Sequence, residues 1–194
     1  MNEILEIKRK EFEIIEQLGD RSFKALRKGT YYFIKKFGDD IQSFNNFVDA
    51  EHRLRVSGVT NPKCYLYDKK LRIAVMEFIE GESCIDLVLK DEITEQIIEL
   101  FFKTFWYAKN DRLALDYAPH NFKFANGKLY YLPFICGKFV SNDSFVQNDI
   151  RLWFYTKEFI KYAHSLGFDT DASHIKSDYE INKQIALMTV KYYR

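Results

Sequence analysis

Residues 113–134 read L-A-L-D-Y-A-P-H-N-F-K-F-A-N-G-K-L-Y-Y-L-P-F, the most informative part of the chain. Asp116 is followed five positions later by Asn121. Two strand-like runs rich in Phe, Tyr and Leu then flank the pair Asn126-Gly127. A type I′ turn needs positive φ at both central residues, which Asn and Gly tolerate, so this pair predicts a β-hairpin. The hairpin would hold in place a loop that presents a carboxylate and a carboxamide.

The composition is that of a folded globular protein. Of the 194 residues 47% are hydrophobic, and 18 Phe and 13 Tyr can supply a substantial core, which excludes an intrinsically disordered chain. The 29 Lys and Arg residues against 28 Asp and Glu residues leave a formal net charge of +1. Because partners recognised through bulk charge need a strong imbalance, we expect no nucleic acid partner and no binding to an anionic membrane.

Cysteine, histidine and hydropathy patterns indicate a reducing compartment. Cys64, Cys84 and Cys136 are widely spaced and form no C-x-x-C motif, which is typical of packed thiols rather than of a disulfide framework. None of the four histidines lies in an H-x-x-x-H motif or beside a cysteine pair, so we expect no structural zinc site. No apolar run approaches the length of a membrane span. We therefore expect a cytoplasmic protein without membrane insertion.

Residues 1–80 alternate strand-like runs with turn signals, which favours an antiparallel sheet. Strands are predicted at 11–18, 22–27, 30–37, 64–67 and 71–78, and a helix with a Phe-rich apolar stripe at 42–57.

Beyond Gly81 the composition changes from strand-like to helical. Helices are predicted at 93–105, 149–166 and 175–193, and residues 135–146 are expected to form an ordered loop. We therefore expect an α+β fold with two lobes in one compact domain. The first lobe, residues 1–80, would be a small antiparallel sheet, and the second, residues 81–194, would be mainly helical.

The loop that carries Asp116 and Asn121 resembles the catalytic loop of the protein-kinase-like superfamily. That loop runs H-R-D-x-x-x-x-N, and a hairpin follows whose second strand leads into D-F-G. The resemblance implies that Asp116 is the catalytic base and that Asn121 binds a magnesium ion. Two features depart from the family, since Ala114-Leu115 replace His-Arg and Pro133 occupies the position of the D-F-G aspartate. Because the Pro133 side chain has no ligand oxygen, magnesium binding is expected to be weak or absent.

The segment L-G-D-R-S-F-K-A-L at 18–26 resembles the family's phosphate loop, L-G-x-G-S-F-G-x-V, at Gly19 and Ser22. Arg21 and Lys24 replace two glycines whose backbone amides approach the phosphates in the family. Two basic side chains could meet the phosphates instead. An ordinary turn between strands accounts for the same residues.

Lys35 stands where the family has the lysine of V-A-I-K. Alternation along the strand sends Lys35 to the same face as Phe33 and Phe37. Glu51 shares the apolar stripe of the helix at 42–57, and the resemblance implies that it pairs with Lys35 at the nucleotide. Three alternatives stay open: a solvated lysine at the edge of the sheet, an ion pair kept only for stability, and a one-residue slip that turns Lys36 inward.

The segment M-E-F-I-E-G-E-S from Met76 resembles the kinase hinge. The resemblance implies that Met76 is the gatekeeper and that the backbone of Glu77 and Phe78 hydrogen-bonds an adenine. A strand that continues into a loop is the alternative interpretation.

The resemblance covers residues 12–165 and is closest to small atypical bacterial kinases, such as lipopolysaccharide-core sugar kinases and tRNA-modification-associated kinases. It implies an ATP-binding pseudokinase, or a strongly impaired phosphotransferase, with a nucleotide and in addition a protein as partners. Lys35, Glu51, Asp116 and Asn121 would share one crevice. The first alternative is an active atypical kinase that phosphorylates a protein, sugar or small-molecule hydroxyl. The second is an interaction scaffold whose cleft is filled by aromatic side chains.

Overall fold

The computed structural model describes residues 3–139, 149–171 and 175–192. Contacts divide the chain into two compact units. We call them the sheet unit (Met1–Arg53 and Asn61–Glu80) and the helical unit (Leu54–Thr60 and Gly81–Arg194). An antiparallel sheet together with several helices confirms the expected α+β class. The units separate in sequence at Glu80–Gly81, where the composition changes, whereas no sequence pattern marks residues 54–60 as part of the helical unit.

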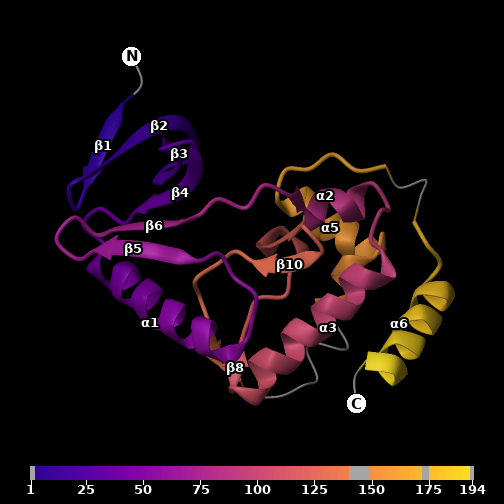
Figure 1. Ribbon diagram of the computed structural model, residues 1–194. Helices are drawn as coiled ribbons and strands as arrows, with labels where there is room; N and C mark the ends of the chain where they lie inside the picture. Colours follow the sequence, from indigo (N-terminus) through magenta and orange to yellow (C-terminus); the bar gives the residue numbers. More distant parts are fainter. Residues whose placement is uncertain (1–2, 140–148, 172–174, 193–194) are drawn as a thin grey trace. The chain divides into compact units, whose positions relative to one another are not determined.

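The sheet unit is built on six antiparallel strands in the order β1-β2-β3-β4-β6-β5 (Figure 1). The strands are β1 (Ile4–Ile7), β2 (Lys10–Gly19), β3 (Ser22–Arg27), β4 (Thr30–Lys36), β5 (Cys64–Asp68) and β6 (Ile73–Glu77). The sequence pattern predicts five of these strands and misses β1, because a run of four residues is too short for its periodicity to be recognised.

One apolar cluster of the sheet unit lies on one face of the sheet. Its buried members are Ile7, Phe12, Ala25, Ile34, Ile73 and Val75. Helix α1 (Ile41–Ser57) packs on the other face, where the ring centre of Phe37 lies 5.4 Å from that of Phe44 and 5.3 Å from that of Phe47. Alternation along β4 therefore puts Ile34 in the core and Lys35 on the face that carries α1.

The helical unit combines helices with two small sheets. Its helices are α2 (Cys84–Leu89), α3 (Glu95–Asn110), α5 (Lys157–Ser165) and α6 (Asp178–Tyr192), with 3₁₀ turns η1 (Pro119–Asn121) and η2 (Asp149–Trp153). One sheet contains β7 (Glu82–Ser83), β9 (Phe122–Ala125) and β10 (Lys128–Tyr131), and the other β8 (Leu113–Ala114) and β11 (Gly137–Lys138). Asn126 and Gly127 join β9 to β10 with φ of 50° and 71°, which confirms the predicted hairpin.

Aromatic rings form the centre of the helical unit. Phe101, Phe122 and Trp153 are fully buried, and the Trp153 ring centre lies 4.3 Å from that of Phe101 and 5.3 Å from that of Phe122. The indole N–H of Trp153 donates a hydrogen bond of 2.8 Å to the Tyr117 carbonyl. The core therefore fixes the loop in which Tyr117 follows Asp116. Helices α3 and α6 lie side by side (Figure 1).

The single helix predicted at 149–166 is wrong. The chain forms the short turn η2, leaves helical geometry, and begins α5 at Lys157. Thr156 causes this new start, because its side chain accepts a hydrogen bond of 3.1 Å from the Phe159 N–H and caps the helix.

The last helix begins at Asp178 rather than at Ile175. Ser177 and Glu180 form a capping box, in which the Ser177 hydroxyl accepts from the Glu180 N–H and the Glu180 carboxylate accepts from the Ser177 N–H. The end of this prediction, at Tyr193, lies outside the described residues, as does the part of the predicted loop 135–146 beyond residue 139.

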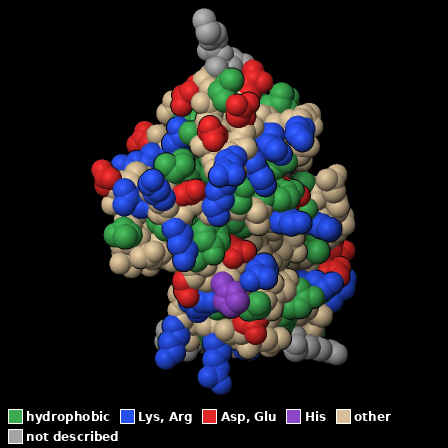
Figure 2. All heavy atoms as spheres, turned by 60° about the vertical axis from the view of Figure 1, so that its left-hand side comes forward, with side chains coloured by type: hydrophobic (Ala, Val, Ile, Leu, Met, Phe, Trp, Pro, Cys, Tyr) green, Lys and Arg blue, Asp and Glu red, His purple; other side chains and the backbone are tan. Residues whose placement is uncertain are grey.

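Charged side chains of both signs are mixed on the surface, in agreement with the small net charge of the chain. Figure 2 shows acidic, basic and apolar side chains interspersed on one face.

All three cysteines are described and none is in a disulfide, and burial raises the pKa of Cys64 and of Cys84 to about 12. Among the described residues, no helix has the length and apolar character that crossing a bilayer requires.

Candidate functional site

The first candidate surface is the face of the sheet unit that carries Lys35. Strand register places Ser22, Lys35 and Ala74 in one row across β3, β4 and β6, and Gly19 of β2 pairs with Ser22. Lys35 is half-buried, while Ala74 is fully buried. The ammonium group of Lys35 can form a charge-assisted hydrogen bond with an anion such as a phosphate.

The connection between β2 and β3 is a tight turn. Gly19 pairs directly with Ser22, so only Asp20 and Arg21 join the strands where the resemblance implies a phosphate loop. The guanidinium of Arg21 donates a hydrogen bond of 2.8 Å to the Phe37 carbonyl. The basic side chain of this turn is therefore held against its own sheet unit, as expected for an ordinary strand turn.

The next row of the same face is aromatic and contains a second lysine. Register aligns Lys24 with Phe33 and Phe33 with Met76. The Lys24 ammonium lies 4.2 Å from the ring centre of Tyr31 and 4.6 Å from that of Phe78, both within range of a cation–π interaction. We call Lys24, Tyr31, Phe33 and Phe78 the aromatic surface. It adjoins Met76, which the resemblance assigns to the adenine site.

Glu51 lies on the same side of the sheet as Lys35. It is half-buried on α1, and its charge, after burial, contributes to the raised pKa of Cys64. Cys64 pairs with Met76 on the face that carries Lys35. On the other face of β4, Lys36 makes an ion pair with Glu3, in which the Lys36 Nζ lies 3.5 Å from a Glu3 carboxylate oxygen. The pair between Lys35 and Glu51 stays a prediction.

The segment that resembles the hinge already uses some of its hydrogen-bonding groups within the sheet. Met76 is buried, with 3% of its surface exposed. The Glu77 N–H donates a hydrogen bond of 2.8 Å to the Lys63 carbonyl, and the Glu77 carboxylate accepts one of 3.1 Å from the Lys63 N–H. Adenine contacts of the kind that the resemblance implies would therefore use other backbone atoms of Glu77 and Phe78.

The second candidate surface is the loop of the helical unit that carries Asp116. Asp116 is exposed, and its carboxylate accepts a hydrogen bond of 3.1 Å from the Ala118 N–H. Asn121 is 8% exposed, and its Nδ2 donates a hydrogen bond of 3.2 Å to the Asp116 carbonyl. The two residues that the spacing singled out are therefore held together inside one loop.

The hydrogen bond of Asn121 also sets the orientation of its carboxamide group. Because Nδ2 donates to Asp116, the carboxamide oxygen is the atom left for a metal ion. The Leu132 N–H donates to the Asn121 carbonyl at 2.8 Å and aligns the end of β10, where Pro133 follows, with this loop. Within the described ranges, no group of three or more His, Cys, Asp or Glu side chains is arranged to hold a metal ion.

Other titratable groups lie near Asp116. The sequence pattern did not indicate that all of them are close to Asp116. Burial, followed by the charge of Asp116, raises the pKa of Asp149 to about 6 and that of Tyr162 to about 12. The hydroxyl of Tyr162 is in hydrogen-bond contact with Nδ1 of His120. Asp149 and Tyr162 come from η2 and α5, far along the chain from Asp116, so no local motif could have indicated their proximity.

Comparisons with known proteins add no family to these observations. No protein-family model matches the chain, and no curated protein matches it. Its function is therefore inferred from its residues and their geometry.

Proposed function

We propose that the chain is a protein-kinase-like, nucleotide-binding protein with a degenerate magnesium site, either a pseudokinase or a strongly impaired phosphotransferase. One observation carries the proposal: Asn121 is hydrogen-bonded to the carbonyl of Asp116 in a loop that runs into a hairpin, and Pro133 follows shortly after the end of that hairpin at Tyr131. A loop acid with a neighbouring carboxamide is suited to orient a hydroxyl and to hold one ion. Pro133 leaves no acidic side chain at the position where the family has its metal-binding aspartate.

Each unit carries its own candidate residues. In the sheet unit, Lys35 beside Ser22 would bind phosphate oxygens, and Glu51 would orient Lys35. The base would bind near Met76 and the backbone of Glu77 and Phe78.

In the helical unit, Asp116 would orient the acceptor hydroxyl, and the carboxamide oxygen of Asn121 would bind a magnesium ion weakly. ATP is thus the proposed ligand, and magnesium contributes little to its binding. The acceptor would be a hydroxyl of a protein, a sugar or a small molecule.

The missing acid sets the expected rate. Loss of one preorganised electrostatic group costs roughly 10²–10³ in rate. Protein kinases commonly turn over at about 1–100 s⁻¹, which leaves about 10⁻³–1 s⁻¹ for this chain. Turnover well above this range would favour a fully active kinase.

Thermal unfolding with ATP tests the proposal. At a ligand concentration of about 100 times Kd, binding adds about 2.7 kcal/mol, which should raise Tm by roughly 5–10 °C for a chain of this size. We expect similar shifts with and without magnesium. Lys35→Met should abolish the shift, whereas Lys36→Met, a neighbouring lysine on the opposite face of the strand, should keep it. Equal shifts for both variants would contradict the assignment of Lys35.

The aromatic surface favours a second candidate, a scaffold that binds no nucleotide. Phe33 stands where the family has the small alanine of V-A-I-K, and Lys24 already lies over the rings of Tyr31 and Phe78. These side chains of the protein itself would then cover the position proposed for the nucleotide base. If this candidate is correct, ATP stabilises neither the wild type nor Phe33→Ala. A shift that appears only in Phe33→Ala would instead identify Phe33 as the obstacle to nucleotide binding.

A further inference from the structure

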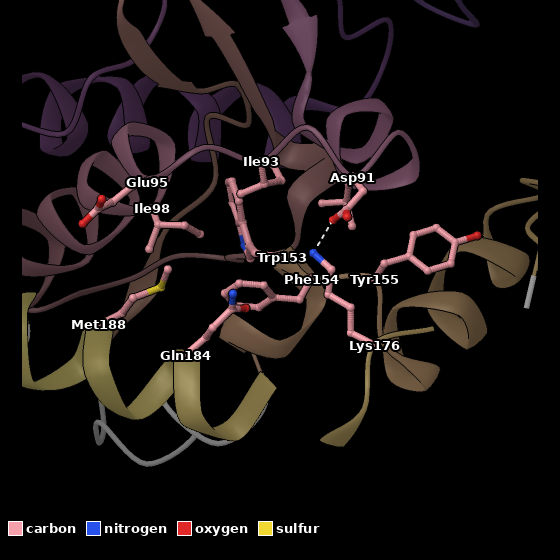
Figure 3. A pocket seen from close by; sticks show the side chains of 11 residues that line it. Asp91, Ile93, Glu95, Ile98, Trp153, Phe154, Tyr155, Lys176, Gln184 and Met188 are labelled. Carbon is pink, nitrogen blue, oxygen red and sulfur yellow. Dashed lines mark hydrogen bonds and ion pairs between the residues drawn. The ribbon is translucent and has the colours of Figure 1, made fainter. Parts of the chain in front are cut away.

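The helical unit contains a cavity of about 250 Å³ (Figure 3), and Asp116 is not among the residues that line it. Its walls come from the region of α2 and α3, from η2 and the residues that follow it, and from α6. The apolar lining consists of Val88, Ile93, Ile98, Trp153, Phe154 and Met188. Half of these residues belong to the core, since Val88, Ile98 and Trp153 are each exposed by 1% or less.

Two ion pairs border this cavity, and in one of them both partners belong to its lining. The Lys176 ammonium is paired with the Asp91 carboxylate, and the dashed line in Figure 3 joins them beside Trp153. Their side chains are 33% and 55% exposed, so both can exchange partners with a ligand from solvent. The two charges come from segments 85 positions apart in the chain and meet only in the folded unit.

The other acidic lining residue is already neutralised. The Glu95 carboxylate is ion-paired with Lys191 and accepts a hydrogen bond of 3.0 Å from the Tyr192 hydroxyl. These contacts lower the pKa of Glu95, so it stays ionised and bound to them. One anion, Asp91, and one cation, Lys176, are therefore the charges that a ligand would meet.

We infer that this cavity binds a compact zwitterion, namely an α-amino acid with an apolar side chain. Its carboxylate would take the place of Asp91 at Lys176, its ammonium would take the place of Lys176 at Asp91, and its side chain would enter the apolar part. Both protein charges then keep a partner of opposite sign. A monoanion would leave Asp91 without a partner of opposite charge, a monocation would do the same to Lys176, and each would make one charge-assisted hydrogen bond fewer than the zwitterion.

The size of the cavity suits a small ligand. An apolar cavity of about 150 Å³ is enough for benzene, so a space of about 250 Å³ accommodates leucine or one of its isomers. The inference is independent of the proposed nucleotide site, because none of its residues belongs to that site.

Titration with L-leucine tests the inference on the whole chain. Calorimetry measures binding, and tryptophan fluorescence, recorded in a Trp106→Phe background so that Trp153 is the emitter, reports on the cavity. Two ligands of the same shape carry only one charge each: 4-methylpentanoate lacks the ammonium and 3-methylbutylamine lacks the carboxylate. We expect saturable leucine binding with a Kd of about 1 mM or lower, and at least about tenfold weaker binding of both single-charge ligands.

Variants of the two charged residues complete the test. Lys176→Met and Asp91→Asn should each weaken leucine binding about tenfold. The matched controls Lys161→Met and Asp169→Asn change exposed residues of the same unit outside the cavity and should leave it unchanged. The inference is overturned if leucine does not saturate at about 10 mM, if a single-charge ligand binds as tightly as leucine, or if the cavity variants and controls bind alike.

Discussion

Replacing Asp149 by Asn should stabilise the protein at neutral pH and change how its stability depends on pH. Asp149 begins η2 and is partly buried, with the carboxylate of Asp116 nearby. Burial first, and the charge of Asp116 second, raise the pKa of Asp149 from 3.8 to about 6. The folded protein therefore binds this proton more tightly than the unfolded chain does.

The sign and the size of the effect follow from this difference. The contribution of Asp149 to stability is complete below about pH 4 and is lost as the pH rises to about 6, because the folded protein then has to accommodate a charge that burial disfavours. At about 1.36 kcal/mol for each pKa unit, the loss is at most about 3 kcal/mol. Since the side chain is partly exposed, solvent screening reduces the loss, and we expect about 1–2 kcal/mol.

Urea unfolding of the wild type and of Asp149→Asn between pH 4 and pH 8 measures this effect. The wild type should lose about 1–2 kcal/mol relative to the variant between pH 4 and pH 7, with most of the change below about pH 6.5. Asp169→Asn, which changes an exposed aspartate of the same unit, serves as the control. A difference between wild type and Asp149→Asn that stays constant with pH would refute the reasoning.

Three further perturbations test other parts of the structure. In Gly81→Ala the new Cβ would lie 2.5 Å from the Phe124 carbonyl oxygen, so urea unfolding should show a loss of about 1–3 kcal/mol, while Gly19→Ala, which has room for a Cβ, should lose much less. Pro133→Asp should make ATP stabilisation dependent on magnesium and raise any phosphoryl transfer about 10²-fold; an unchanged magnesium response would argue against the assignment of this position. Arg151→Met removes the ion pairs that join η2 to α5 and α6. Hydrogen exchange should therefore accelerate in the first turn of α6, and the free energy of unfolding should fall by about 1–2 kcal/mol. Unchanged exchange would show that these pairs do not anchor the helix.

Local sequence patterns were sufficient for most elements of this fold. The strand at Ser22–Arg27 has the predicted bounds, and the Asn126-Gly127 turn has the predicted positive φ at both residues. Such features depend on a few neighbouring residues, whose alternation and turn preferences are visible in the chain itself. The break before α5 also had a local cause, the capping side chain of Thr156, but the apolar periodicity on both sides concealed it.

Contacts between segments far apart in the sequence could not be predicted from local patterns. Lys24 has the spacing of a phosphate-loop residue, yet its ammonium lies over the rings of Tyr31 and Phe78, because strand register brings β3, β4 and the end of β6 together. The raised pKa of Asp149 likewise depends on the packing of η2 near Asp116. Neither hydropathy nor spacing encodes such neighbours, since they arise only when the core packs and closes loops of many residues.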